Sequence, residues 1–194
     1  LHQAIRTEDW PETERLARSL LKEQPDKEDV LFMLAASLAM QGRPLEASEV
    51  NAELTRLRPK EPLYWSNYAT LLREAGSLQE AFSAQQEALR LAPDDPDQLT
   101  SLALLQLETG EYVAARETMQ AALKHDATSP RVRIHAARTC EICRDQEDAE
   151  ALLKPWRNWL PLPEDLQIEL ADLLLSTGDG SDALVVLEDL VRRG

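Results

Sequence analysis

The sequence predicts an all-α protein built of stacked helical hairpins, because small and turn-forming residues recur every 34 positions. One alanine column comprises Ala35, Ala69, Ala103, Ala137 and Ala171, and a second comprises Ala47, Ala81, Ala115, Ala149 and Ala183. Two further columns hold Gly42, Gly76, Gly110 and Gly178, and Pro25, Pro59, Pro93 and Pro161. An ordinary amphipathic bundle would show the helical period without such fixed columns. The pattern therefore indicates a repeat array.

Each column has a physical role in a helical hairpin. Two antiparallel helices approach most closely where side chains are small, and alanine provides this at the lowest cost to the helix. Glycine ends the first helix, since its left-handed conformation reverses the chain without a Cβ clash. Proline closes the second helix, which it cannot continue. Arg144 interrupts the glycine column, and Ala127 interrupts the proline column.

In chain order, the columns define one partial repeat and five further repeats that form a single solenoid domain. The predicted boundaries are 1–27, 28–61, 62–95, 96–129, 130–163 and 164–194. A partial helix over residues 1–7 precedes eleven complete helices, and turns are expected near the four column glycines. The second helix of repeat 1 begins near Pro11, because a helix tolerates proline in its first turn.

Repeat 2 pairs a helix over about residues 27–41 with one over about residues 44–57. Its first helix is apolar almost all round, since Phe32, Met33 and Met40 lie off the predicted packing face. Two interpretations stay open. The absent half of repeat 1 would cover these side chains, or they form an apolar ligand patch.

Repeats 3 and 4 are the most regular, and repeat 5 departs most from the pattern. Arg144 replaces the turn glycine, and Pro155 lies inside the predicted second helix, followed by Trp156 and Trp159. We expect Pro155 to kink this helix and to free a backbone carbonyl.

Repeat 6 restores the columns but has an apolar second helix, with Val185, Val186, Leu187, Leu190 and Val191. The terminal element of a solenoid should present a polar outer face. We therefore expect more chain, a partner, or self-association through the terminal helices to cover this strip. Substituting Val186 or Val191 with glutamate is expected to favour the monomer.

Composition limits the partners. The 194 residues carry a net charge of −14, which repels nucleic acid and anionic membranes. No apolar run approaches the ~18 residues that a membrane span needs. Cys140 and Cys143 are interpreted as small buried hydrophobes, because a structural zinc site wants four ligands. Such thiols favour a reducing, cytoplasmic location.

No feature of the sequence indicates catalysis. His2, His125 and His135 have no metal-ligand spacing, and no glycine-rich phosphate loop follows a strand. The carboxylates are spread over helix faces that should be solvated. We predict no enzymatic activity, no cofactor and no metal.

One segment carries the consensus of a known family. Residues 65–93 match the consensus order W-x2-L-G-x2-Y, A-x3-F, P. The matching residues are Trp65, Tyr68, Ala69, Leu72, Gly76, Ala81, Ala88 and Pro93. The chain thus resembles the tetratricopeptide-repeat family over essentially its whole length. This resemblance implies a right-handed superhelix whose first helices line a groove for a peptide or partner protein. The opening over residues 6–14 also resembles bacterial repeat proteins that carry a sulfotransferase or glycosyltransferase domain, so an accessory array of a larger enzyme is the alternative.

The predicted groove positions are the residues of each first helix that lie off its packing face. For repeats 3 to 5 they are Leu63, Ser66, Asn67, Thr70, Arg73, Glu74, Asp97, Thr100, Ser101, Leu104, Glu108, Arg131, Ile134, His135, Arg138 and Glu141. The proposed peptide-binding subset is Asn67, Thr70, Arg73, Arg131, His135 and Arg138.

Charge and the resemblance define the expected ligand. Repeat 5 is the only net-positive repeat, at +1, which favours an acidic or C-terminal peptide bound by its arginines. The resemblance implies that Asn67 holds peptide backbone. It does not extend to the carboxylate clamp of chaperone-tail binders, because Phe32, Ala36, Asp97 and Ser101 occupy the clamp positions. The alternative for the arginine face is a solvated stripe paired with neighbouring acids.

Overall fold

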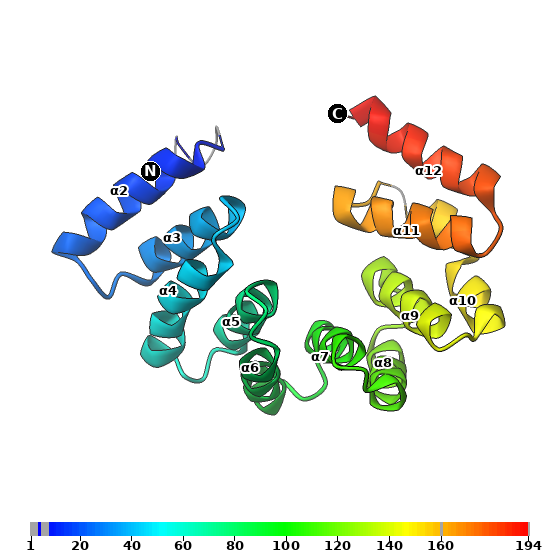
Figure 1. Cartoon of the computed structure of the whole chain (residues 1–194), viewed down its shortest axis with the longest axis horizontal. Helices are drawn as coiled ribbons and strands as arrows, with labels where there is room; N and C mark the ends of the chain where they lie inside the picture. The colour runs from blue at the N-terminus through cyan, green and yellow to red at the C-terminus, as the bar shows by residue number, and fades with distance from the viewer. Residues whose placement is uncertain (1–3, 5–7, 160, 194) are drawn as a thin grey trace. The chain divides into compact units, whose positions relative to one another are not determined.

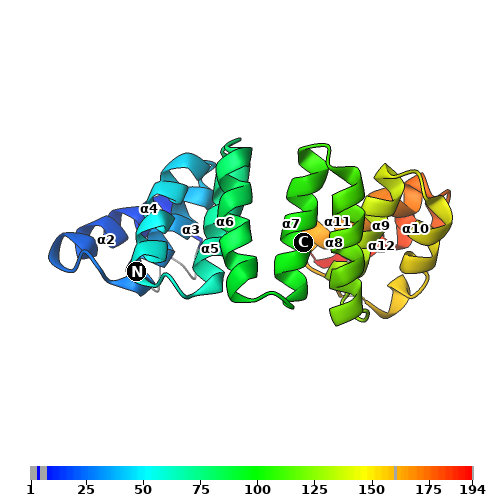
Figure 2. The ribbon, with the colours of Figure 1, turned by 90° about the horizontal axis from the view of Figure 1, so that it is seen from below.

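The computed structural model describes residue 4 and residues 8–159 and 161–193, where helices joined by turns and short loops are the secondary structure. These residues form eleven α-helices and one 3-10 helix, without a strand (Figures 1 and 2). The all-α fold and the eleven complete helices are confirmed. The partial first helix over residues 1–7 lies outside the described residues, apart from helical Ala4. Within the part that is described, every helix is too short or too polar to span a bilayer.

The chain divides into two compact units, Leu1–Pro93 and Asp94–Gly194. In unit 1 the helices are α2 (Trp10–Glu23), α3 (Glu28–Met40), α4 (Pro44–Leu57), α5 (Pro62–Glu74) and α6 (Leu78–Leu91). Helices α3 and α4 form one hairpin, and α5 and α6 form another. Helix α2 packs on α3, and α4 packs on α5, so neighbouring hairpins stack.

Unit 2 repeats this arrangement with a shortened hairpin. Its elements are α7 (Pro96–Glu108), α8 (Tyr112–His125), α9 (Pro130–Ile142), α10 (Gln146–Leu153), η1 (Trp156–Asn158), α11 (Glu164–Ser176) and α12 (Gly180–Arg193). The hairpins are α7 with α8, α9 with α10, and α11 with α12. Helix α9 also packs directly against both α7 and α11.

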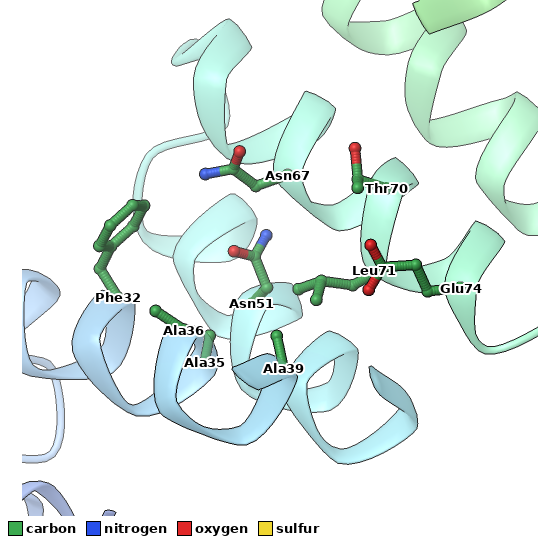
Figure 3. Close-up of a pocket in the computed structure, with 9 residues that line it drawn as sticks. All are labelled: Phe32, Ala35, Ala36, Ala39, Asn51, Asn67, Thr70, Leu71 and Glu74. Carbon is green, nitrogen blue, oxygen red and sulfur yellow. The ribbon is translucent and has the colours of Figure 1, made fainter. Parts of the chain in front are cut away.

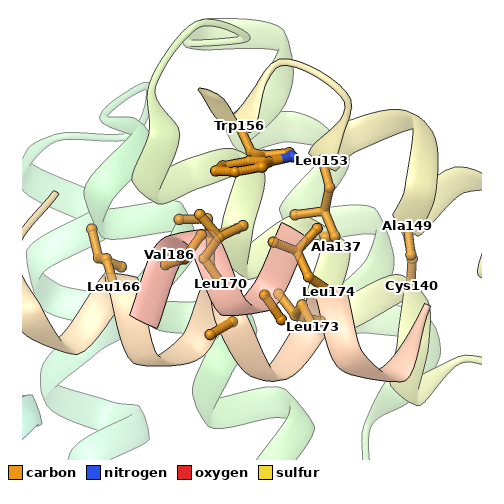
Figure 4. Close-up of a cluster of buried hydrophobic side chains, with 13 residues drawn as sticks. Ala137, Cys140, Ala149, Leu153, Trp156, Leu166, Leu170, Leu173, Leu174 and Val186 are labelled. Atoms are coloured by element: carbon orange, nitrogen blue, oxygen red, sulfur yellow. The ribbon is translucent and has the colours of Figure 1, made fainter. Parts of the chain in front are cut away.

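The two alanine columns are buried in the helix packing, as expected for positions of close helix approach. All ten alanines are at most 3% exposed. Four of them in unit 2 join a core cluster in which Trp156, Leu170 and Val186 pack together from η1, α11 and α12 (Figure 4). A second cluster in unit 1 centres on Leu34 and Leu38 of α3.

The helix starts also follow from the sequence. Four helices, α4, α5, α7 and α9, begin with a proline, whose missing N–H has no partner to lose there. Asp95 accepts hydrogen bonds from the N–H groups of Asp97 and Gln98 at the start of α7. Such caps satisfy amide groups that a helix leaves without a partner.

The turn between α9 and α10 keeps the glycine geometry without glycine. Arg144 has a φ of 61°, in the left-handed region that Gly110 occupies one repeat earlier with a φ of 81°. The backbone hydrogen bonds also match. The N–H of Asp145 donates to the carbonyl of Cys140 at 2.8 Å, as the N–H of Glu111 does to Gln106 at 2.7 Å. The hairpin fold therefore imposes a strained conformation on Arg144.

Pro155 ends its helix instead of kinking it, which corrects the predicted long second helix of repeat 5. Helix α10 stops at Leu153, and the 3-10 turn η1 follows. The carbonyls of Ala151 and Leu152 are freed, as expected, and they accept hydrogen bonds from the Arg133 guanidinium at 3.3 and 2.9 Å. The Arg133 guanidinium thus caps the C-terminal end of α10, where Pro155 provides no N–H donor.

The apolar strip predicted on the last helix is also corrected at one position. Val186 is 0% exposed and belongs to the core of unit 2, so a glutamate there would disrupt folding. The exposed apolar side chains of α12 are Leu184, Val185, Leu187 and Val191.

Candidate functional site

A cavity of about 230 Å³ opens in unit 1 between α3, α4 and α5 (Figure 3). It is lined by Phe32, Ala35, Ala36, Ala39, Asn51, Asn67, Thr70, Leu71 and Glu74. Two of the predicted peptide-binding residues, Asn67 and Thr70, meet here with Phe32 of the predicted apolar patch. The cavity thus joins two features that the sequence left separate.

The cavity exists because α3 and α5 make little direct contact. Three alanines of α3, at 35, 36 and 39, line it and leave the space between the helices open. In unit 2 the first helices of neighbouring repeats pack tightly, and Ile134 of α9 is 0% exposed. Phe32 holds the equivalent repeat position in unit 1 and is 40% exposed. The bulky side chain at this repeat position is therefore packed between first helices in unit 2, whereas in unit 1 it lies beside the open cavity.

Asn51 of α4 places a polar group at the buried end of the cavity. The residue is only 1% exposed, and its Nδ2 donates a hydrogen bond to the carbonyl of Tyr64 at 2.8 Å. Its Oδ1 accepts no hydrogen bond from any residue that the structure describes. Figure 3 shows this oxygen on the side of Asn51 that faces Ala36 and Phe32. A ligand donor is the group that such an oxygen lacks.

Sequence reasoning missed Asn51, because it considered only first helices as ligand-binding. A signal was present. The equivalent positions of repeats 4 and 5 hold the buried apolar residues Met119 and Leu153, whereas repeats 2 and 3 hold the buried amides Asn51 and Gln85. Buried amides need hydrogen-bond partners, which marks this column as a place to examine.

The rim of the cavity is polar. The Asn67 amide is half-buried and makes no hydrogen bond within the described part of the chain. The Thr70 hydroxyl donates to the carbonyl of Ser66 at 3.1 Å, which leaves its oxygen available as an acceptor. Glu74 is exposed and pairs with no described cation. Arg73, the third predicted residue on α5, does not line the cavity and already interacts with another group.

The predicted cations of repeat 5 lie together on α9, but two of them face acids of the next repeat. Arg138 forms ion pairs with Glu141 and Asp172, each at 2.6 Å. The His135 Nδ1 lies 3.2 Å from the Glu169 carboxylate, without the geometry of a hydrogen bond. Arg131 is exposed and has no ion pair among the described residues. Pairing with neighbouring acids, the alternative that the sequence left open, therefore holds for His135 and Arg138.

These contacts lower the pKa of the half-buried acid Glu169. Burial alone would raise the pKa of Glu169, but His135 and Arg138 outweigh it and hold that pKa below its usual range. The two pairs join positions one repeat apart, since 135 and 169, like 138 and 172, differ by 34. They therefore also tie α9 to α11.

Two predicted groove residues are buried instead. Thr100 is 3% exposed, and Ile134 is fully buried. Both hold the same repeat position, where the next first helix packs against α7 and α9. The prediction placed this position in the groove because it treated each hairpin alone, without the packing of the next hairpin against it.

Cys140 is buried as the sequence predicted, whereas Cys143 is only half-buried. Cys140 belongs to the core of unit 2, and burial raises the pKa of its thiol to about 11. A neutral buried thiol is a poor nucleophile and a poor metal ligand. Among the described residues, no group of histidine, cysteine and acidic side chains is arranged to hold a metal ion.

Comparison with known proteins identifies the repeat unit. One family model, described as tetratricopeptide repeat, matches residues 72–139, and a second with the same description matches residues 47–96. The chain is built of tetratricopeptide repeats. No curated protein sequence matches the chain.

Solved structures share the tetratricopeptide-repeat (TPR) fold. A thermophilic TPR protein of Thermus thermophilus is 22% identical, with 89% of this chain and 94% of that chain covered and a TM-score of 0.69. A TPR protein from Parabacteroides merdae is 19% identical, with 98% and 76% covered and a TM-score of 0.72. MamA from Desulfovibrio magneticus RS-1 is 18% identical, with 79% and 86% covered and a TM-score of 0.69. At these identities the likeness concerns the fold, a solenoid of helical TPR repeats.

Proposed function

We propose that this TPR chain is a non-catalytic protein-interaction module that binds a peptide on the first helices of its repeats. The cavity of unit 1 is the observation that supports this proposal. It combines an apolar floor with amide groups of Asn51 and Asn67 that still have hydrogen-bonding capacity. Recognition sites are commonly concave and apolar, with a few polar groups that fix the orientation of the ligand.

Unit 2 would contribute a separate contact through α9. Arg131, His135 and Arg138 form its cationic face, and we propose that an acidic or C-terminal peptide binds there. Arg131 should make the main contact with the peptide, because the guanidinium of Arg138 is already engaged in ion pairs. The affinity of such a peptide should fall as salt is added. Arg131→Ala should cost under ~1 kcal/mol of binding free energy, since the side chain is exposed.

Selection of peptides from a random displayed library, using the whole chain as bait, tests the proposal. Selected peptides are synthesised, and their affinities are compared for Asn67→Ala, Arg131→Ala and Glu80→Gln variants by titration calorimetry. Glu80 is an exposed residue of α6 outside both surfaces and serves as the control. The affinity of each selected peptide should fall for the Asn67→Ala or the Arg131→Ala variant but not for the Glu80→Gln variant. Peptides that bind all three variants like the parent would refute this location.

We also propose that the exposed apolar face of α12 supports self-association. Leu184, Val185 and Val191 are exposed there. Sedimentation velocity of the parent and of Val185→Glu tests it. A parent that stays monomeric at high concentration would remove this hypothesis.

The alternative function, an accessory array of a larger enzyme, remains a separate hypothesis. The complete reading frame decides it, because a sulfotransferase or glycosyltransferase domain would be encoded beside the repeats.

A further inference from the structure

The cavity of unit 1 offers hydrogen-bond acceptors and a negative charge, but no cation. None of its nine lining residues is basic, and Glu74 is the only charged one. Asn51 presents its Oδ1 at the buried end, and Thr70 presents its hydroxyl oxygen at the rim. A ligand that reaches Asn51 and Glu74 must therefore supply donors to them.

The surrounding electrostatics have the same sign. Residues 1–93 contain 11 basic and 15 acidic side chains. Several arginines are already neutralised by acids, since Arg43 pairs with Glu14 and Glu46 and Arg58 pairs with Glu28. Glu74 has no such partner within the described residues. Its carboxylate is thus available to a cation from outside.

The walls suit a long aliphatic stem. Ala35, Ala36, Ala39 and Leu71 form apolar surface, and Phe32 exposes an aromatic ring beside it (Figure 3). Lysine and arginine side chains bury their methylene groups on such surfaces while their charged heads reach polar groups. An aromatic face also attracts a cation. At about 230 Å³, the cavity is smaller than the ~300–1,000 Å³ typical of sites for whole small molecules, which favours a single side chain.

We propose that this cavity receives a lysine or arginine side chain of a partner peptide. The inference rests on the proposed peptide-binding function and specifies the side chain that unit 1 selects. The stem lies against the alanines and Phe32, and the head donates to Asn51, Asn67 or Thr70 and pairs with Glu74. An acidic side chain would meet the carboxylate of Glu74, and an aliphatic one would offer no donor to the Asn51 oxygen.

A series of five pentapeptides tests this selectivity. They share alanine flanks and blocked ends, and the central residue is lysine, arginine, norleucine, glutamine or glutamate. Binding to the whole chain is followed by NMR, using the side-chain amide signals of Asn51 and Asn67. The lysine and arginine peptides should shift both signals and bind about tenfold more tightly than the norleucine peptide, as expected for donors to an uncompensated acceptor. The glutamate peptide should bind weakest.

Two matched variants locate the charge. Glu74→Gln should weaken the lysine peptide about three- to fivefold, the range for a partly solvated ion pair, and leave the norleucine peptide unchanged. Glu80→Gln removes the same charge from an exposed site of α6 outside the cavity and should change neither. Ala36→Leu, at an exposed position of α3, should weaken every peptide by filling the cavity without disturbing the core.

The outcomes separate this inference from the proposed function. Equal binding of the lysine and norleucine peptides, no binding by any of the five, or no effect of Glu74→Gln on the lysine peptide would overturn the inference. Peptides selected from the displayed library would in each case still report on peptide binding, through their dependence on Asn67 or Arg131. Loss of both dependences would instead overturn the proposed function.

Discussion

Arg144→Gly should stabilise unit 2, although it removes a side chain and adds nothing. Arg144 is exposed, makes no ion pair among the described residues, and has a φ of 61°. A left-handed conformation costs a residue with a Cβ about 1–2 kcal/mol. Glycine avoids this cost but loses about 0.4–1 kcal/mol through the greater freedom of the unfolded chain. The net gain should be about 0.5–1 kcal/mol.

Two control variants isolate the backbone term. Arg144→Ala removes the charge but keeps the Cβ, so the free energy of unfolding should change by less than ~0.5 kcal/mol. Gly110→Ala makes the opposite change one repeat earlier. A Cβ at Gly110 would meet no atom within 4 Å, so any loss must come from its φ of 81°. We expect that loss to be about 0.5–1 kcal/mol.

Urea unfolding measures these differences. Far-UV circular dichroism reports on all helices. Tryptophan fluorescence reports on the repeat that contains Arg144 once Trp10 and Trp65 are replaced by phenylalanine, so that only Trp156 and Trp159 remain. Both probes are needed, because repeat arrays need not unfold in one step. If Arg144→Ala stabilised the protein as much as Arg144→Gly, charge and not backbone strain would be responsible, and the reasoning would fail.

Three further predictions test the packing and the electrostatics. Ala81→Leu should cost ~1–3 kcal/mol by forcing α5 and α6 apart, whereas Glu80→Ala on the exposed face should change little; equal melting shifts would contradict the assigned phase. Arg133→Met should cost about 1–3 kcal/mol in urea unfolding, because the carbonyls of Ala151 and Leu152 lose a charged donor; an unchanged midpoint would show that water replaces it. Folding lowers the pKa of Glu169, so the stabilisation from its carboxylate is present above its unfolded pKa and is lost as pH falls through the folded pKa. Glu169→Gln should therefore make the free energy of unfolding less dependent on pH in the acid range. A variant whose pH profile is displaced but keeps the slope of the parent would contradict this.

The amino-acid sequence by itself determined the helical hairpins, their turns and the residues at their closest contacts. These features depend on local properties, namely alanine's small size, glycine's left-handed conformation and proline's missing donor. These properties act in the same way in every hairpin of the chain. In agreement, all ten column alanines are at most 3% exposed. Even the exception at Arg144 could be located from the sequence, because the 34-residue register specifies where the turn must fall.

Only the tertiary structure decided which side chains remain free to bind. Ile134 is buried and Phe32 is exposed at the same repeat position, because first helices pack closely at one place and diverge at the other. Arg138 is engaged by Asp172, an acid 34 residues away. The Asn51 amide borders a cavity that no single hairpin contains. A hairpin's sequence specifies its own contacts, but the exposure and charge of its binding face depend on the side chains of the next hairpin.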